Sequence, residues 1–244
     1  MAKEYLPVTD DQRAIAIYAQ TALDTVETIV HGMSKVRVRV SNGGHGIMLS
    51  LLRASADHAR ASAFLIASNP GDLAASALAL HRLQIEQLVR GIFFGLDASP
   101  AELDFFNKRD ELPERPNEKG KLERLSVARL VAITETKMDL GHGGQFGRMH
   151  AQVKNTLNGV VHGGHSLLAY YQGPDGVGCS VPLEAILYFL ANSVTLVHFS
   201  MAMLVGEGEE QDPLVVHQLL EPIHEAFVSF QSSYDETAAR LGLS

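Results

Sequence analysis

The chain has few of the residues and motifs on which covalent or metal-based chemistry depends. Its 244 residues include one cysteine, Cys179, which excludes an internal disulfide and a cysteine-based zinc site and fits a reducing compartment. The sequence has no Gly-x-Ser-x-Gly turn, no His-Glu-x-x-His pair, and no histidine at a recognisable spacing from Cys179. Nucleophilic catalysis by serine or cysteine therefore finds little support.

Basic residues are also scarce. Twenty Lys and Arg stand against 28 Asp and Glu, which gives a formal net charge of −8 and a pI near 5.7. This balance argues against a broad basic surface for duplex nucleic acid, but it leaves room for a small basic pocket. The N-terminal stretch Met1–Pro7 lacks an apolar core, so we expect no signal peptide and a cytoplasmic protein.

A membrane-spanning segment is not expected either. The longest apolar run covers about residues 183–205 and contains polar side chains along its length (Glu184, Asn192, Thr195, His198 and Ser200). Such a run is more typical of a helix in a protein core than of a membrane span.

What the chain does have is apolar residues at helical spacing. Hydrophobic residues make up 46% and charged residues 20%, enough for an ordinary globular core. Helices are expected over about residues 9–30, 47–67, 72–96, 99–106, 122–138, 182–205 and 213–241, and a further helix ends near His162. We predict an all-α bundle of about seven helices that forms a single domain over residues 1–244.

The segments between these helices carry turn residues. Residues 35–40 alternate like a short extended connector, and the glycine-rich residues 41–46 are interpreted as a plain loop, because no strand or Lys-Ser/Thr pair frames them. Asp72 is the expected N-cap of the third helix. Residues 107–120, charged and containing two prolines, are predicted to form a flexible loop or lid, and a turn-rich stretch is expected after His165.

One polar line runs along an otherwise apolar helix. His150, Lys154, Asn158 and His162 recur every fourth residue, which places them one turn apart on one helix face. The residues between them are partly apolar, and a Gly-Gly pair then ends the helix. Polar groups on a buried helix need partners, so this line is the first candidate for a site.

A second polar line lies on the third predicted helix. Arg82, Glu86 and Arg90 are again four residues apart, and apolar residues wrap more than one face, so the helix is predicted to be central. These charges can pair along the helix, and we expect the line to face the first one across the bundle. The structural interpretation is that the three charges fix helix register and that Asn158 and His162 cap backbone carbonyls.

A metal site is another possible use of these histidines. His162 and His165 are three residues apart, with His142 and His150 upstream, and neutral imidazoles can hold zinc. However, the Gly-Gly pair breaks the helix between His162 and His165, and no acidic residue lies in the same stretch. We therefore predict no metal ion and no cofactor, with His165 capping a helix or facing solvent.

Both lines resemble motifs of known helical proteins. A group of bacterial all-helical proteins of unknown function shares Arg-x-x-x-Glu-x-x-x-Arg and Asn-x-x-x-His-Gly-Gly, found here at 82–90 and 158–164; the resemblance covers roughly residues 47–205. More distantly, the pattern resembles the HEPN superfamily of helical bundles, many of which are ribonucleases in toxin–antitoxin and phage-defence systems. The HEPN motif, Arg-Asn-x-x-x-His, has an arginine where this chain has Leu157.

The resemblance implies an endoribonuclease that cleaves single-stranded RNA without a metal ion. His162 would act as general base or acid, and Asn158 would orient it. Arg90 would stabilise charge on the phosphate, and Glu86 would hold Arg90 in place. The other polar side chains of the two lines and the next histidine would bind substrate (Arg82, His150, Lys154 and His165). The resemblance also implies a homodimer and, for a toxin, a cognate antitoxin.

The residues leave three functions open. The first is the HEPN-like ribonuclease, the second is a non-catalytic helical interaction or regulatory module, and the third is a metal- or small-ligand-binding bundle. Leu157 in place of the motif arginine favours the second over the first, although Arg82 or Arg90 could supply the missing charge.

Overall fold

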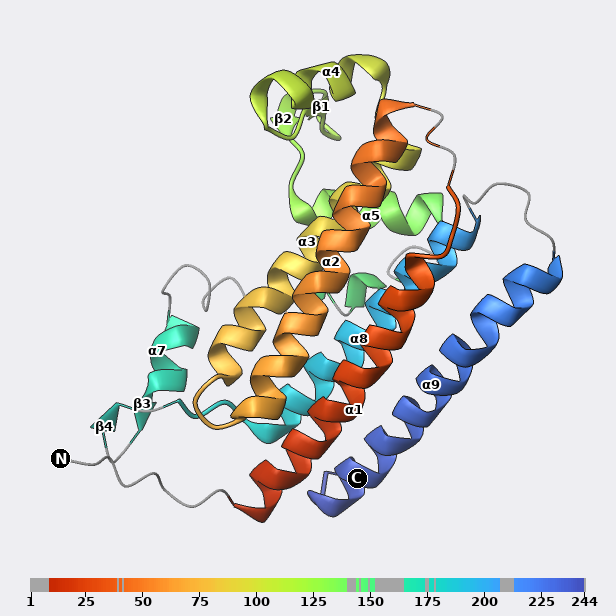
Figure 1. The fold of residues 1–244 in the computed structure, drawn as a ribbon. Helices are drawn as coiled ribbons and strands as arrows, with labels where there is room; N and C mark the ends of the chain where they lie inside the picture. The colour runs from red at the N-terminus through yellow and green to blue at the C-terminus, as the bar shows by residue number, and fades with distance from the viewer. Residues whose placement is uncertain are drawn as a thin grey trace.

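The structure, a computed structural model, describes residues 9–38, 40, 42–139, 144, 146–148, 150–151, 165–173, 176–177, 179–206 and 213–243. These residues are almost entirely helical, which confirms the predicted all-α class (Figure 1). The helices are α1 (Asp10–Met33), α2 (Gly43–Ser68), α3 (Ala74–Leu96), α4 (Pro100–Arg109), α5 (Val127–Lys137), α7 (His165–Tyr171), α8 (Leu183–Gly206) and α9 (Pro213–Arg240). Two antiparallel hairpins join β1 (Glu114–Pro116) to β2 (Leu122–Arg124) and β3 (Gln172–Gly173) to β4 (Gly176–Val177).

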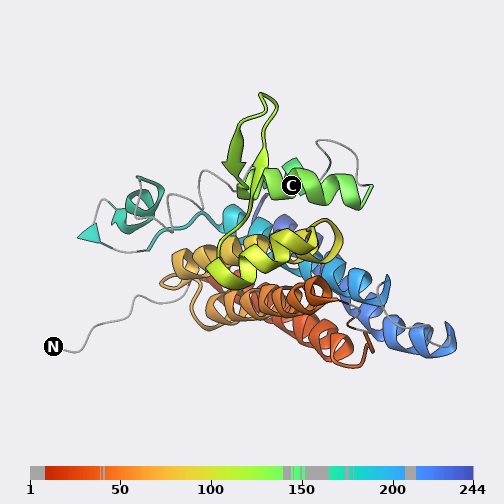
Figure 2. The same cartoon turned by 90° about the horizontal axis from the view of Figure 1, so that it is seen from above.

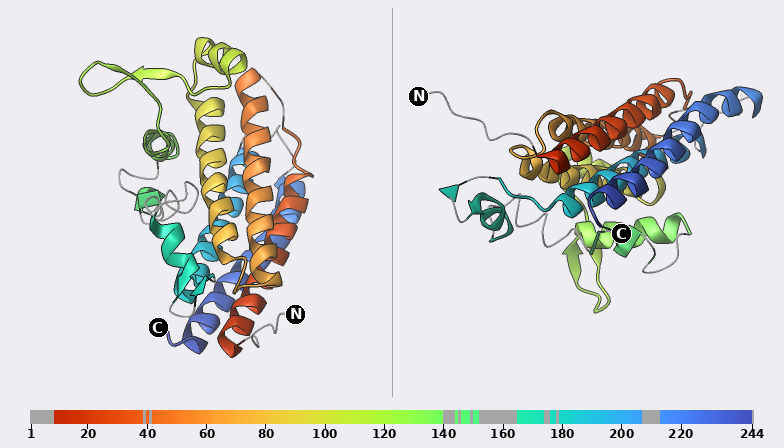
Figure 3. Two further views of the ribbon diagram at one scale, coloured as in Figure 1. Left: turned by 90° about the vertical axis from the view of Figure 1, so that its left-hand side faces the viewer. Right: turned by 90° about the horizontal axis from the view of Figure 1, so that it is seen from below.

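The long helices α1, α2, α3, α8 and α9 form the body of the bundle. α2 and α3 make the most extensive helix pair, and α1 packs against α2, α8 and α9. α4 covers one end of the bundle, the β1–β2 hairpin projects outward beside it, and α5 and α7 lie along the side of α3 (Figure 3). Seen from above, α7 and its hairpin project on the side of the bundle away from α9 (Figure 2).

Glycines allow α2 and α3 to approach closely. A Cβ atom at Gly44 would lie 2.3 Å from the backbone carbonyl oxygen of Phe94, and one at Gly95 would lie 2.3 Å from the sulfur of Met48. A larger residue at either position would push the helices apart. The pair is therefore a rigid platform, and α3 presents its polar face from it.

Side-chain caps are present at the two helices that were predicted to start near residues 9 and 99. The Thr9 hydroxyl accepts a hydrogen bond from the Gln12 backbone N–H at 3.1 Å, and the Gln12 side chain accepts one from the Thr9 N–H, which forms a capping box for α1. Ser99 and Glu102 form the same reciprocal pair at α4, with Pro100 in its first turn. These pairs satisfy backbone donors that would otherwise be unpaired.

Two predicted helix starts are wrong. α2 begins at Gly43, inside the predicted loop 41–46, because the Asn42 side chain accepts a hydrogen bond from the His45 backbone N–H at 3.0 Å and caps the glycine-rich turn. Asp72 is not the N-cap of α3. It closes a turn with Asn69, and α3 begins at Ala74 without a side-chain cap.

The predicted loop or lid at 107–120 is also wrong. Residues 114–116 pair with 122–124 as the β1–β2 hairpin, and Gly120 adopts the left-handed conformation (φ 74°) in its turn. Helix α5 consequently starts at Val127, capped by Ser126, rather than at residue 122. Pro116 is compatible with the hairpin because β1 is an edge strand, where a residue without an N–H group is tolerated.

The stretch after His165 begins with α7, which was not predicted. The β3–β4 hairpin follows, with Gly173 paired to Gly176, in the segment predicted to be rich in turns.

α8 fulfils its predicted role as a core helix, with buried side chains from Ile186 to Leu204. Within the described residues it is also the one helix long and apolar enough to cross a membrane, and 56% of its most apolar window is buried in the structure. Buried core helices of soluble proteins meet the same criterion of length and composition.

Candidate functional site

The polar line on α3 is partly buried, and two of its members are paired. The Arg90 guanidinium donates a hydrogen bond to the Glu86 carboxylate one turn before it, and the two side chains are 31% and 18% exposed. This confirms the predicted Glu86–Arg90 pair. No ion pair joins Arg82 to Glu86 in the described part of the chain.

Each of the two arginines has a buried N–H donor without an acceptor among the described residues. Nη1 of Arg82 and Nε of Arg90 are buried and have no hydrogen-bond partner among the described residues. A buried N–H group without an acceptor is costly, and a charged one more so. Two guanidinium groups against one carboxylate also leave this face with net positive charge. The face is therefore suited to an anion that brings several acceptor oxygens.

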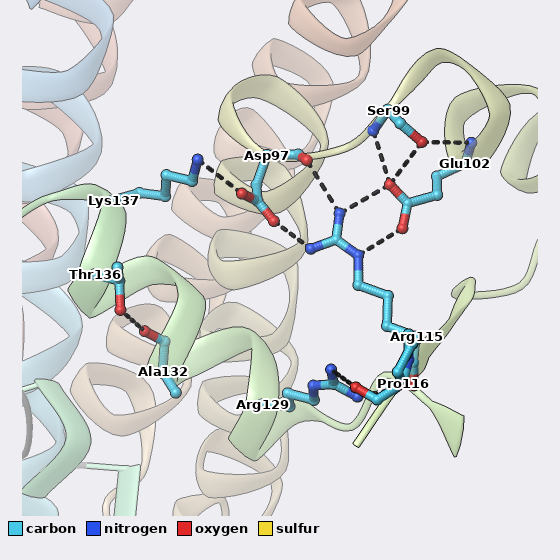
Figure 4. Close-up of polar contacts among 9 residues, drawn as sticks. All are labelled: Asp97, Ser99, Glu102, Arg115, Pro116, Arg129, Ala132, Thr136 and Lys137. Atoms are coloured by element: carbon cyan, nitrogen blue, oxygen red, sulfur yellow. Dashed lines mark hydrogen bonds and ion pairs between the residues drawn. The ribbon is translucent and has the colours of Figure 1, made fainter. Parts of the chain in front are cut away.

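An ion-pair network lies at the C-terminal end of α3, close to this face in sequence (Figure 4). The Arg115 guanidinium donates to both oxygens of Glu102, at 2.6 and 2.8 Å, pairs with Asp97, and lies 4.9 Å from the ring centroid of Phe93. Lys137 reaches the other Asp97 oxygen at 2.8 Å. Burial raises the pKa of Asp97, but the hydrogen bonds from Lys137 and Arg115 outweigh it and hold the pKa below its usual value.

The same network fixes the β1–β2 hairpin to the bundle. The hydrogen bond from Arg115 lowers the pKa of Glu102, and Glu102 in turn raises the pKa of Arg115, so both stay charged. Arg129 donates to the backbone carbonyls of Arg115 and Pro116, at 3.1 and 2.5 Å. Sequence analysis missed this anchor, since its members come from the end of α3, from α4, from β1 and from α5, and their spacing has no periodicity.

A buried polar cluster joins α3 to α8. Nδ1 of His81 lies 2.8 Å from the Gln84 side-chain oxygen and 2.8 Å from the Ser193 hydroxyl, and the Gln84 amide donates to the Ser193 carbonyl at 2.8 Å. Burial lowers the pKa of His81 to about 4, and the hydrogen bond with Gln84 offsets only part of this effect. His81 and Ser193 are almost inaccessible to solvent, so the pair acts in packing rather than as a nucleophile and base.

Three residues of the predicted line that ends at His162, namely Lys154, Asn158 and His162 itself, lie outside the described residues. His150 is half-buried, and His165 is exposed as the first residue of α7. Whether the two polar lines face each other therefore stays a prediction.

The segment that precedes the line ending at His162 contacts α5. The Gly147 backbone N–H donates to the carboxylate of Glu135 at 2.7 Å, and Glu135 is 4% exposed. α5 itself packs on α3. Gly147 is thus held on the helix that covers one side of α3 (Figure 3).

No metal centre is visible in the part of the chain that the structure describes. No group of three or more His, Cys, Asp or Glu side chains there is placed to hold a metal ion.

Fold and site together define a helical-bundle protein whose central helix carries a partly buried Arg-Glu-Arg line. The chain belongs to a family of unknown function (DUF6988), whose model matches residues 52–228. This confirms the predicted membership of an uncharacterised family, and the match contains both polar lines. No curated protein and no solved structure matches the chain.

Proposed function

We propose that this protein is a HEPN-like ribonuclease that cleaves single-stranded RNA without a metal ion, with a HEPN-like core at about residues 47–205. The observation that carries the proposal is the α3 face, where Arg82 and Arg90 flank Glu86 and retain buried, unpartnered N–H groups. Guanidinium groups match phosphate oxygens in geometry and charge. Single strands suit a local site better than a duplex does, because the chain lacks a broad basic surface.

The chemistry needs a base, a charge stabiliser and an orienting group. In the proposal, His162 takes the proton from the ribose 2′-hydroxyl, and the 2′-oxygen attacks the adjacent phosphorus. The bond from phosphorus to the 5′-oxygen breaks, the imidazolium returns the proton to that oxygen, and a 2′,3′-cyclic phosphate remains. Arg90 and Arg82 stabilise the charge that develops on the phosphoryl oxygens. Asn158 orients His162, and Glu86 fixes the direction of Arg90.

The remaining polar side chains are assigned to substrate binding. In the sequence, Lys154 and His150 belong to the same four-residue spacing as His162, and His165 is exposed as the first residue of α7. The proposal includes a cytoplasmic homodimer with a site in each subunit. A toxin or phage-defence protein of this kind would be restrained by a cognate antitoxin.

The test is cleavage of a labelled, mixed-sequence single-stranded RNA by the purified full chain in EDTA. We expect His162→Ala to lower the rate by about 100- to 10,000-fold, the usual contribution of a general base. A matched control is His31→Ala, which removes an exposed histidine at the end of α1 and should leave the rate unchanged.

The outcome that overturns the proposal is a folded wild-type protein that cleaves no RNA. The second candidate, a non-catalytic helical interaction module, would then stand, and Leu157 in place of the motif arginine favours it. In that case His162→Ala and Arg90→Ala should change thermal stability and nothing else.

A further inference from the structure

The net negative charge of this protein comes from its C-terminal quarter. Residues 183–244 contain nine Asp and Glu but one basic residue, Arg240, so they carry a formal charge of −8. The preceding 182 residues hold 19 acidic and 19 basic side chains and are neutral overall. α8 and α9 therefore belong to an acidic region, while the rest of the bundle is balanced.

A groove of about 640 Å³ lies between α8 and α9 in this region. Its apolar lining includes Met201 and Val205 from α8 and Leu220 and Ile223 from α9. α8 and α9 are in contact, and α9 lies on the outside of the bundle (Figure 1). A volume of this size accommodates several large side chains.

The floor of the groove is firmly built. Met201 and Ile223 are almost fully buried, and a Cβ atom on Gly32 of α1 would lie 2.3 Å from the Ile223 side chain and 3.6 Å from Met201. The apolar bottom is thus held by three helices. Met201 adds an unbranched, adaptable side chain of the kind that accepts varied apolar partners.

The acidic lining of the groove is unpaired. Glu221 and Glu225 are exposed, and neither makes an ion pair or hydrogen bond within the described residues. Leu214, 60% exposed, lies seven residues before Glu221 and so on the same face of α9. An apolar floor next to free carboxylates and an exposed leucine is a surface with both hydrophobic and electrostatic binding capacity.

We propose that this groove binds a basic amphipathic helix of a partner protein. Such a helix places leucine-like side chains into the groove and its lysines or arginines against Glu221 and Glu225, the helix-in-groove mode of recognition. Nucleic acids and anionic membranes are repelled by the same charges. A second copy of the α9 face is also repelled, since it is acidic too. The inference does not depend on ribonuclease activity.

The experiment measures fluorescence anisotropy of a labelled synthetic helix of about 18 residues, with leucine at positions i, i+3, i+4 and i+7 and lysine elsewhere, titrated with the full chain. We expect saturable binding. Glu225→Lys should weaken it by about ten-fold or more, because attraction becomes repulsion. The matched control is Glu236→Lys, which makes the same charge change at an exposed site on α9 outside the groove and should weaken binding by less than about three-fold.

A second variant separates the groove from charge alone. Ala202 lines the groove and is exposed, so Ala202→Trp fills the space without disturbing the core, and it should also reduce binding by about ten-fold. A peptide of the same composition with scrambled leucine positions should bind weakly. Four outcomes would overturn the proposal: no binding of the helix, equal binding of the scrambled peptide, equal effects of Glu225→Lys and Glu236→Lys, or full binding to Ala202→Trp.

Discussion

Carboxylates at α3 and on α9 differ in their exposure and in their pairing. On α3 and at its C-terminal end, Glu86 and Asp97 are 18% and 15% exposed and are paired with arginine or lysine. On α9, Glu221 and Glu225 are exposed and unpaired in the described part of the chain. Partly buried charges need fixed partners, whereas exposed charges are stabilised by water and are free to meet another molecule.

The comparison indicates two different kinds of binding. The α3 face is partly preorganised, because Glu86 holds the Arg90 guanidinium and both arginines have buried N–H groups, which suits a small, defined group such as a phosphate. The α8–α9 groove is acidic and open, which suits an extended basic partner. The two surfaces belong to different helices, since the Arg-Glu-Arg line is on α3 and the groove is formed by α8 and α9.

The largest expected effect concerns activity at the α3 face. Arg90→Ala should lower the RNA cleavage rate by about 100- to 1,000-fold, because it removes a fixed positive charge next to the phosphate. Arg90→Lys should recover only part of the rate, since lysine keeps the charge but loses the planar fork. Glu225→Gln, in the α8–α9 groove, should change kcat/KM by less than about two-fold. Opposite effects of similar size, a loss for Arg90→Ala and a gain for Glu225→Gln, would mean that net charge, and not a site, governs the reaction.

The next effect concerns the pH dependence of the unfolding free energy, to which the buried His81 of α3 contributes. Burial lowers the pKa of His81 from 6.5 to about 4. Because the folded-state value lies below the unfolded one, the contribution of neutral His81 is complete above pH 6.5 and is lost as the pH falls from 6.5 toward 4. A shift of this size corresponds to roughly 3 kcal/mol of unfolding free energy.

The measurement is urea unfolding at several pH values across that window. His81→Gln should show a shallower loss of stability on acidification than the wild type, and His31→Gln, at an exposed position, should retain the wild-type slope. A wild-type slope in His81→Gln would show that other groups dominate acid unfolding.

Sequence patterns predicted most helices but not the contacts between them. Periodic apolar residues indicated α1, α8 and α9 closely, because amphipathic helices record their buried face locally. The β1–β2 hairpin escaped prediction, since its place depends on Arg115 meeting Asp97 and Glu102, residues 18 and 13 positions away. Long-range pairs of this kind leave no periodic trace.

The candidate site was predictable to a similar degree. The spacing of Arg82, Glu86 and Arg90 indicated a shared helix face and a Glu86–Arg90 pair, and the structure has both. It could not indicate which N–H groups lack acceptors, because that depends on neighbouring helices. His81 was overlooked, although its position three residues before Gln84 on an apolar helix was the available signal.

A smaller effect tests the anchor at the end of α3. Arg115→Ala should lower the unfolding free energy by roughly 2–3 kcal/mol, because Glu102 loses its guanidinium partner and Asp97, which is also 15% exposed, keeps only Lys137. The matched control is Arg124→Ala, whose pair with Glu111 is 58% and 45% exposed and should contribute less than about 0.5 kcal/mol. Urea unfolding at pH 7 measures both. Similar losses for the two variants would remove the distinction between inner and outer charges.

The smallest expected effect comes from two isosteric substitutions, one on the α3 face and one in the α8–α9 groove. Glu86→Gln leaves the partly buried Arg90 guanidinium without its carboxylate and should lower the unfolding free energy by about 1 kcal/mol. Glu221→Gln removes an exposed carboxylate that has no partner in the described residues and should change it by less than about 0.5 kcal/mol. High salt should leave the difference largely intact, because partly buried pairs are screened less than exposed charges. A Glu86→Gln protein as stable as Glu221→Gln would show that water, rather than Arg90, stabilises the Glu86 carboxylate, and that the α3 face is not preorganised.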